Sequence, residues 1–168
     1  MINAPRVLIV AEHASAQFGG EAVLSLHYYR VLRARNVQVW LVVHERTRQE
    51  LLTLFPADAD RIYFVSDTLL HKTLWRLSSF LPQRLAGFTL GFAMRLSTQL
   101  AQRKVIKALV RSVGITVVHQ PMPVSPKEPS LIYGFGVPVI IGPMNGGMDY
   151  PAGFAKLHGA AGNFLLSL

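Results

Sequence analysis

The chain has 168 residues, of which 51% are hydrophobic and only 15% are charged, a composition that excludes intrinsic disorder and fits one folded domain. It contains no cysteine, so disulfide bonds and thiolate metal sites are excluded. The formal net charge of +8 is carried by residues 61–113, which hold nine Lys and Arg residues against one acidic residue, Asp67. This concentration predicts a single positive face.

Short apolar runs alternate with longer amphipathic stretches along the chain. The runs have strand length, and the stretches place apolar residues at helical spacing. The expected strands are 7–11, 37–43, 61–65, 115–119 and 137–141, and the expected helices are 21–35, 45–55, 69–81, 91–113 and 125–133. This alternation predicts a single α/β domain over residues 1–168, with a doubly wound, mostly parallel, Rossmann-like sheet and right-handed crossovers.

A long loop joins the first expected strand to the first expected helix, and it ends in Gly19-Gly20. Glycine lets the backbone approach a ligand closely, and a helix N-terminus attracts an anion. The glycines follow the strand by eight residues, so the G-x-G-x-x-G dinucleotide fingerprint is absent, as is the G-K-[ST] of a phosphate-binding loop. Glu12 and His13 follow the strand directly and are expected at the ligand-binding edge of the sheet. The alternative is an ordinary flexible loop before a helix.

Two further features are expected at the same edge. His119 ends the fourth strand, where its side chain could donate to a sugar hydroxyl or a phosphate oxygen, although a structural histidine is the commoner case. The turn after the fifth strand reads Gly142-Pro-Met-Asn-Gly-Gly-Met-Asp-Tyr-Pro151, and its core can present N–H groups and the Asn145 amide outward. Asp149 is a candidate polar contact for an acceptor hydroxyl. The alternative is a capping or hairpin turn.

Other chemistries lack support in the sequence. The six histidines show no two-His spacing typical of a metal site, so we expect no metal cofactor. The G-x-S-x-G motif of serine hydrolases is also missing.

These features together resemble the N-terminal half of a GT-B glycosyltransferase and are most similar to glycosyltransferase family 4. The matching parts are the strand at 7–10, the loop ending Gly19-Gly20-Glu21-Ala22, the strand-end His119, and the stretch from Pro138 to Pro151. The resemblance spans essentially the whole chain, but residues 61–113 match only in helical character.

The resemblance implies a retaining transfer of a sugar, hexosyltransferase-like, from a nucleotide-sugar donor to an acceptor hydroxyl in glycan, polysaccharide or glycolipid synthesis. Gly19, Gly20 and Glu21 would then lie on the donor side, and His119 would contact the donor sugar near the reacting centre. His13, Asn145, Gly146, Gly147 and Asp149 would lie on the acceptor side, toward a glycan or a lipid-linked acceptor. The nucleotide-sugar is a co-substrate, and no metal is expected.

Members of the family carry a second, donor-binding domain C-terminal to this one, for which residues 1–168 leave no room. We therefore expect an acceptor-side fragment that is inactive alone unless a separate domain or chain supplies the donor half. Two alternatives stay open: a non-catalytic partner or membrane-docking module of the same fold, and an unrelated α/β nucleotide-binding enzyme.

The positive region at 61–113 fits anionic phospholipid, a polyanionic acceptor or nucleic acid, and a solvated face without a partner is the alternative. Residues 69–81 combine Leu, Trp75 and Phe80 with Lys72 and Arg76, a mixture typical of a membrane headgroup region and also compatible with a core helix. Nucleic acid is not expected, because no binding module accompanies the charge. No signal peptide or membrane span is evident, so the expected location is cytoplasmic, in peripheral contact with the inner face of the membrane.

Overall fold

The computed structural model describes residues 4–67, 83–126 and 128–145, of which 83–92 are described as backbone only. Its sheet has five strands, all parallel, in the order β3-β2-β1-β4-β5. The strands are β1 (Arg6–Val10), β2 (Gln38–His44), β3 (Ile62–Val65), β4 (Val117–Gln120) and β5 (Val139–Ile141). The α/β, Rossmann-like fold expected from the alternating pattern is confirmed.

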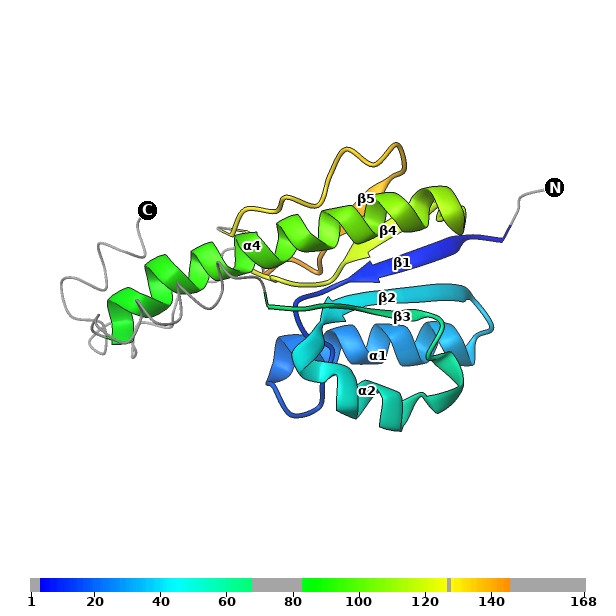
Figure 1. Ribbon diagram of the computed structural model, residues 1–168, viewed down its shortest axis with the longest axis horizontal. Coiled ribbons are helices and arrows are strands. Elements are labelled where there is room, and N and C mark those ends of the chain that lie inside the picture. Colours follow the sequence, from blue (N-terminus) through cyan, green and yellow to red (C-terminus); the bar gives the residue numbers. More distant parts are fainter. Residues whose placement is uncertain (1–3, 68–82, 127, 146–168) are drawn as a thin grey trace.

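Helices cover both faces of this sheet. Figure 1 shows α4 on one side, with α1 and α2 on the other. The helical elements are α1 (Gly20–Ala34), η1 (Glu45–Thr47), α2 (Arg48–Leu54), η2 (Pro56–Asp58) and α4 (Gln83–Ser112). The helix expected at 69–81 lies outside the described residues.

The helix expected at 125–133 is wrong. The described residues of this stretch form an irregular segment that follows β4. Pro126 would be tolerated in the first turn of the expected helix, but Pro129 lacks the N–H donor that the helix would need after that turn. The segment still reaches the core, because Ile132 and Phe135 are buried beside α4.

The core consists of two layers separated by the sheet. Leu8 and Val10 of β1 pack toward α4, whereas Ile9 between them packs toward α1. These three side chains are at most 1% exposed, as expected for the central strand of a sheet covered on both faces. On α1, Ala22, Leu26 and Tyr29 are buried at a spacing of one helical turn, which fixes the helix against the sheet.

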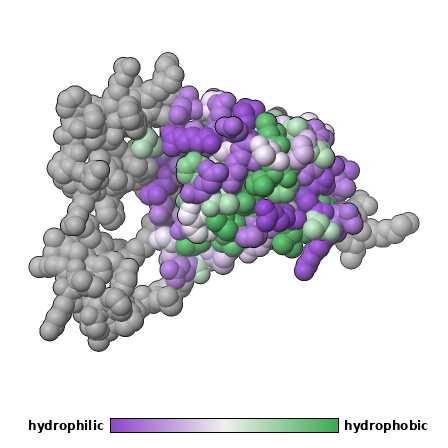
Figure 2. All heavy atoms as spheres, turned by 90° about the horizontal axis from the view of Figure 1, so that it is seen from below, coloured by the Kyte–Doolittle hydropathy of each residue, from purple (hydrophilic) through white to green (hydrophobic). Residues whose placement is uncertain are grey.

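Some hydrophobic surface remains outside the core. Seen from below, green hydrophobic areas lie between hydrophilic side chains (Figure 2). Scattered apolar residues are normal on protein surfaces, and we assign no interface to this side.

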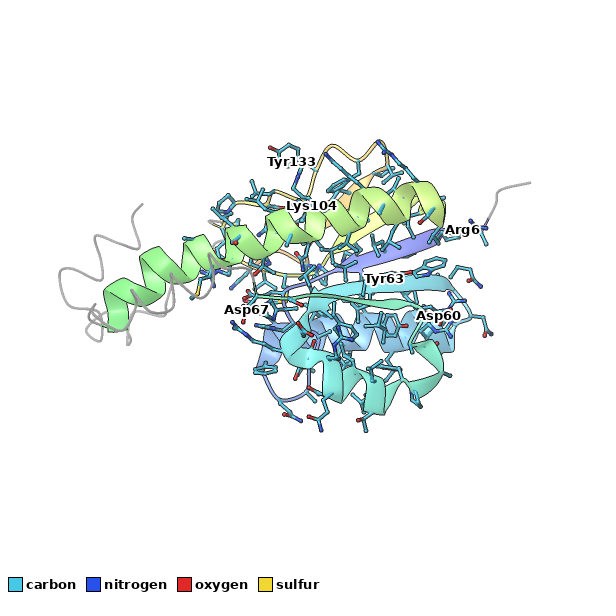
Figure 3. All side chains as sticks on the ribbon, viewed as in Figure 1. Arg6, Asp60, Tyr63, Asp67, Lys104 and Tyr133 are labelled. Carbon is cyan, nitrogen blue, oxygen red and sulfur yellow. The ribbon has the colours of Figure 1, made fainter. Side chains whose placement is uncertain are left out.

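The parallel strands give the sheet one carboxyl edge. Figure 3 shows Asp60, which precedes β3, and Asp67, which follows it, at opposite ends of the sheet. Asp67 therefore marks the carboxyl edge, where ligands bind in open α/β sheets.

Candidate functional site

A pocket of about 530 Å³ opens at the carboxyl edge of the sheet. Its walls come from the end of β1, the start of α1, the residues after β2, the middle of α4 and the segment after β4. The lining residues are Val10, Ala11, Glu12, His13, Phe18, Gly20, Glu21, Ala22, His44, Arg46, Met94, Arg95, Thr98, Gln99, Gln102, Gln120, Met122, Pro123 and Glu128. The chain leaves β1 toward β2 and returns from β3 to β4 on its other side, so the pocket lies at the topological switch point.

The N-terminus of α1 forms one wall of the pocket. Gly19 is its N-cap, with φ 97° and ψ 178°, a conformation that is essentially restricted to glycine. No side chain caps the helix, and the first intrahelical bond runs from the Val23 amide to the Gly19 carbonyl at 3.1 Å. The N–H groups of the first turn precede that bond and are available to a ligand. This wall therefore favours an anion.

The loop before α1 is held in place by a carboxylate from α2. Glu50 accepts a hydrogen bond from the Ser15 hydroxyl and another from the Ala16 amide at 2.7 Å. Ser15 is fully buried, and its oxygen accepts from the Gln17 amide at 2.9 Å. These bonds fix the path of the loop toward Gly19. The sequence pattern gave no sign of Glu50, because the two ends of the contact are 35 residues apart.

His13 lines the pocket, and one of its ring nitrogens is buried without a hydrogen-bond partner in the described part of the chain. Its Nε2 lies 3.6 Å from Glu12 Oε1, and its ring stacks on Phe18 with the centroids 5.2 Å apart. Its Nδ1 is buried and has no hydrogen-bond partner among the described residues. Burying a nitrogen without a hydrogen-bond partner costs free energy. A ligand hydroxyl that hydrogen-bonds to this nitrogen would recover that free energy on binding.

His44, at the end of β2, also lines the pocket. The Arg46 amide donates to its Nδ1 at 3.3 Å, so its Nε2 carries the proton and donates to Asp67 Oδ1 at 3.1 Å. Asp67 also pairs with the Arg46 guanidinium at 3.2 Å. The ring centroids of His13 and His44 are 6.2 Å apart. Asp67 thus fixes the tautomer of His44 beside the pocket.

Both histidines are held in the neutral form. Burial lowers the pKa of His13 and outweighs the opposing charge of Glu12, with Arg46 adding to the lowering. Burial also lowers the pKa of His44, and Arg46 adds to this effect against the opposing charge of Asp67. A neutral His13 can accept a hydrogen bond at Nδ1, whereas a protonated one cannot.

The lowered pKa values predict acid sensitivity. An unfolded histidine, with a pKa of about 6.5, takes up a proton that the folded one refuses, so acid favours the unfolded chain. We expect the free energy of unfolding to fall as the pH drops below about 6.5, by up to about 1.4 kcal/mol per histidine per pH unit. Urea denaturation at pH 7, 6 and 5 measures this. His44→Gln should flatten the dependence, while His27→Gln, at an exposed position of α1, should keep it. A wild-type stability that is constant over this range would contradict the prediction.

The structure brings together four of the residues singled out from the sequence. His13, Gly20 and Glu21 line the pocket, as does Glu12, which was also expected at this edge, and Gly19 adjoins it as the N-cap of α1. His119 does not line it: its side chain lies on the α1 face, edge-on to Tyr28 at 4.7 Å between centroids.

The turn after β5 is described only in part. His119 Nε2 donates to the Gly142 carbonyl at 2.8 Å, which ties β4 to the start of this turn. Asn145 is exposed, and its backbone N–H donates to the Val124 carbonyl at 2.7 Å. Asn145 does not line the pocket. Gly146, Gly147 and Asp149 lie outside the described residues.

Polar residues of α4 line the pocket and were missed in the sequence. Gln102, 2% exposed, donates from Nε2 to the Ala11 carbonyl at 2.7 Å and so ties α4 to the end of β1. Arg95 pairs with Glu128 at 3.2 Å. The sequence did contain a signal for Gln102, which lies on the buried face of this helix one turn before Ile106. A polar residue on an otherwise apolar helix face indicates a functional site or a long-range hydrogen bond.

Comparison with protein-family models, curated proteins and solved structures found no match to this chain. Among the described residues, no group of three or more His, Asp or Glu side chains could hold a metal ion. Within the same residues, no helix is long and apolar enough to cross a membrane. Fold and pocket define the chain as a Rossmann-like α/β domain with a polar pocket at its switch point.

Proposed function

We propose that this chain is the acceptor-side domain of a retaining GT-B glycosyltransferase that uses a nucleotide-sugar donor. The observation that carries the proposal is the meeting, in one pocket, of the uncapped N-terminus of α1 with the unpartnered Nδ1 of His13. The first favours a phosphate and the second a hydroxyl, and a nucleotide-sugar or its acceptor offers both groups.

Groups that attract an anion line the pocket, together with the carboxylates of Glu12, Glu21 and Glu128. In the transfer, the bond between the anomeric carbon and the diphosphate oxygen breaks, and a bond from the acceptor oxygen to that carbon forms. The leaving phosphate takes the acceptor proton, so no further base is needed. The first turn of α1 and the guanidinium groups of Arg46 and Arg95 lie around the pocket and would stabilise the leaving diphosphate.

His13 has the chemistry of an orienting group for a hydroxyl. Its ring stacks on Phe18 and its Nε2 lies near Glu12, and a neutral Nδ1 can accept a hydrogen bond. Phe18 is 53% exposed at the pocket, so its ring can also contact the apolar face of a sugar. We place His13 on the acceptor side.

The proposal includes a second domain. A pocket of about 530 Å³ is sized for a single small ligand, and the donor and acceptor together need more contacts than its walls provide. We propose that a donor-binding domain, in the same polypeptide or in another chain, faces this pocket. Donor contact by His119 and acceptor contact by Asn145 stay predictions, since both residues lie outside the pocket walls.

Ligand titration followed by amide NMR tests this function. We expect uridine and guanosine diphosphates and their hexose conjugates to shift the amide signals of His13, Gly20, Glu21 and Ala22. NAD and free hexose serve as comparison ligands. Shifts at these amides with NAD but not with any nucleoside diphosphate or nucleotide-sugar would overturn the proposal, as would no shift with any of them at millimolar concentration.

A further inference from the structure

A row of exposed side chains runs along the outer side of α4. Leu100, Lys104, Lys107 and Arg111 follow one another at intervals of four, three and four residues, which places them on one helical face. All four are exposed, and Leu100 is 54% exposed. The buried residues of the helix, Ile106 among them, lie on the side that packs on the sheet. We call these four residues the α4 stripe.

The cations of the stripe have no acidic neighbours. The sequence of α4 contains six Lys and Arg residues and no Asp or Glu. Among the described residues, the only ion pair that α4 forms is Arg95–Glu128, near the pocket. Lys104, Lys107 and Arg111 therefore keep their charge for an external partner, whereas Arg33, Arg46 and Arg48 each pair with an acidic side chain.

An exposed aromatic ring lies beside the stripe. Tyr133, in the segment between β4 and β5, is 60% exposed. The Arg103 guanidinium lies 5.0 Å from its ring and 5.2 Å from that of Phe135, and it donates to the Tyr133 carbonyl at 3.0 Å. Figure 3 shows Lys104 and Tyr133 on the same side of the molecule. Arg103 thus holds the ring next to α4.

The side chains of this surface favour an anionic membrane over nucleic acid as the partner. Lys and Arg attract both anionic lipid headgroups and nucleic acid phosphates. A leucine and a tyrosine that are each more than half exposed fit a membrane interface, where apolar and aromatic side chains insert between headgroups. The stripe also lies on the outer face of a helix whose other side packs on the sheet, and so is open to a broad flat surface.

We propose that the α4 stripe, together with Tyr133, docks this domain on an anionic phospholipid membrane. Leu100 lies within one turn of Gln99 and Gln102, which line the pocket, so docking brings the pocket beside the membrane surface. The proposal rests on charge and exposure alone and does not depend on the reaction of the pocket. Within the positive region of residues 61–113, the proposal assigns membrane binding to the α4 stripe.

Vesicle flotation tests the proposal. We expect the chain to bind vesicles of phosphatidylcholine with about 30% phosphatidylglycerol, to bind pure phosphatidylcholine far less, and to be released at 0.5 M NaCl. Lys104→Gln/Lys107→Gln should weaken binding about thirtyfold, since each cation near an anionic surface contributes about 1 kcal/mol and about 1.4 kcal/mol corresponds to a factor of ten. Arg30→Gln/Arg35→Gln removes the same charge from exposed positions of α1 on the opposite side, and should leave binding nearly unchanged.

A second pair of variants separates insertion from attraction. Leu100→Ser and Tyr133→Ser keep the charge and should weaken binding to anionic vesicles severalfold at low salt, where the wild type is bound. Unchanged thermal melting shows that each variant folds. Three outcomes would overturn the proposal: equal binding to neutral and anionic vesicles, equal losses for the α4 and α1 double variants, or tighter binding to duplex DNA than to anionic vesicles.

Discussion

Replacing Asp58 with alanine is expected to lower the free energy of unfolding by about 3 kcal/mol, the lower end of the range for breaking a buried ion pair. Asp58 is 5% exposed and accepts hydrogen bonds from Arg33 Nε at 2.8 Å and from a second guanidinium nitrogen at 2.5 Å. It also accepts from the Tyr29 hydroxyl at 3.1 Å, and Tyr29 is fully buried. Alanine would leave that hydroxyl and the guanidinium without their acceptor.

The titration of this carboxyl agrees with its role. Burial by itself raises the pKa of Asp58, but the hydrogen bonds from Arg33 and Tyr29 outweigh it, and the pKa is lowered overall. The stabilisation is therefore present above the ordinary aspartate pKa and is lost as the pH falls through the lower pKa of the folded state. Acidification below about pH 4 should reproduce part of the effect of the substitution.

Asp60→Ala is the matched control for Asp58→Ala. Asp60 lies two residues further along the chain, is exposed, and loses the same group on substitution (Figure 3). We expect it to change stability by no more than about 0.5 kcal/mol. Urea denaturation at pH 7 compares the two variants. Equal losses, or a loss below about 1 kcal/mol for Asp58→Ala, would show that the buried pair does not hold η2 against α1.

The fold could be predicted because its signals are local. Each strand is a short apolar run, and β1 is apolar on both faces, which is the pattern of a central parallel strand. The segment at 125–133 was mispredicted as a helix because Pro126 is compatible with a first helical turn, although Pro129 lacks the N–H that the next turn needs. Its order depends on distant bonds, such as that from the Leu131 amide to Gln99 at 2.7 Å.

The site could be predicted from the sequence only for residues that come soon after a strand in the chain. His13 and Gly20 flank the loop after β1, and their place at the carboxyl edge follows from parallel strands. Successive side chains of a strand point to opposite faces of the sheet. Because Val118 of β4 faces α4, the next residue, His119, faces α1 and does not reach the pocket. The polar position of Gln102 on the apolar face of α4 indicates a long-range contact, but the local sequence does not identify Ala11, 91 residues away, as its partner.

Gly20→Trp is expected to weaken nucleotide-sugar binding at least tenfold, or about 1.4 kcal/mol, without destabilising the fold. Gly20 lines the pocket and has helical backbone geometry, and a Cβ added there meets no atom within 4 Å. An indole at this position fits the helix and occupies the space before the first turn of α1. Gly19 is unsuitable for this purpose, because its φ of 97° would add backbone strain to any effect on binding.

His27→Trp places the same side chain on the same helix, at an exposed position outside the pocket walls. We expect this control to bind nucleotide-sugar like the wild type, because only the indole at position 20 excludes the ligand from the N-terminus of α1. Calorimetric titration measures both affinities, and thermal melting checks both folds. If Gly20→Trp bound nucleotide-sugar with wild-type affinity, the donor would not bind at the N-terminus of α1 in this pocket. Equal weakening in both variants would trace the loss to α1 as a whole and remove the case for its N-terminus as the phosphate site.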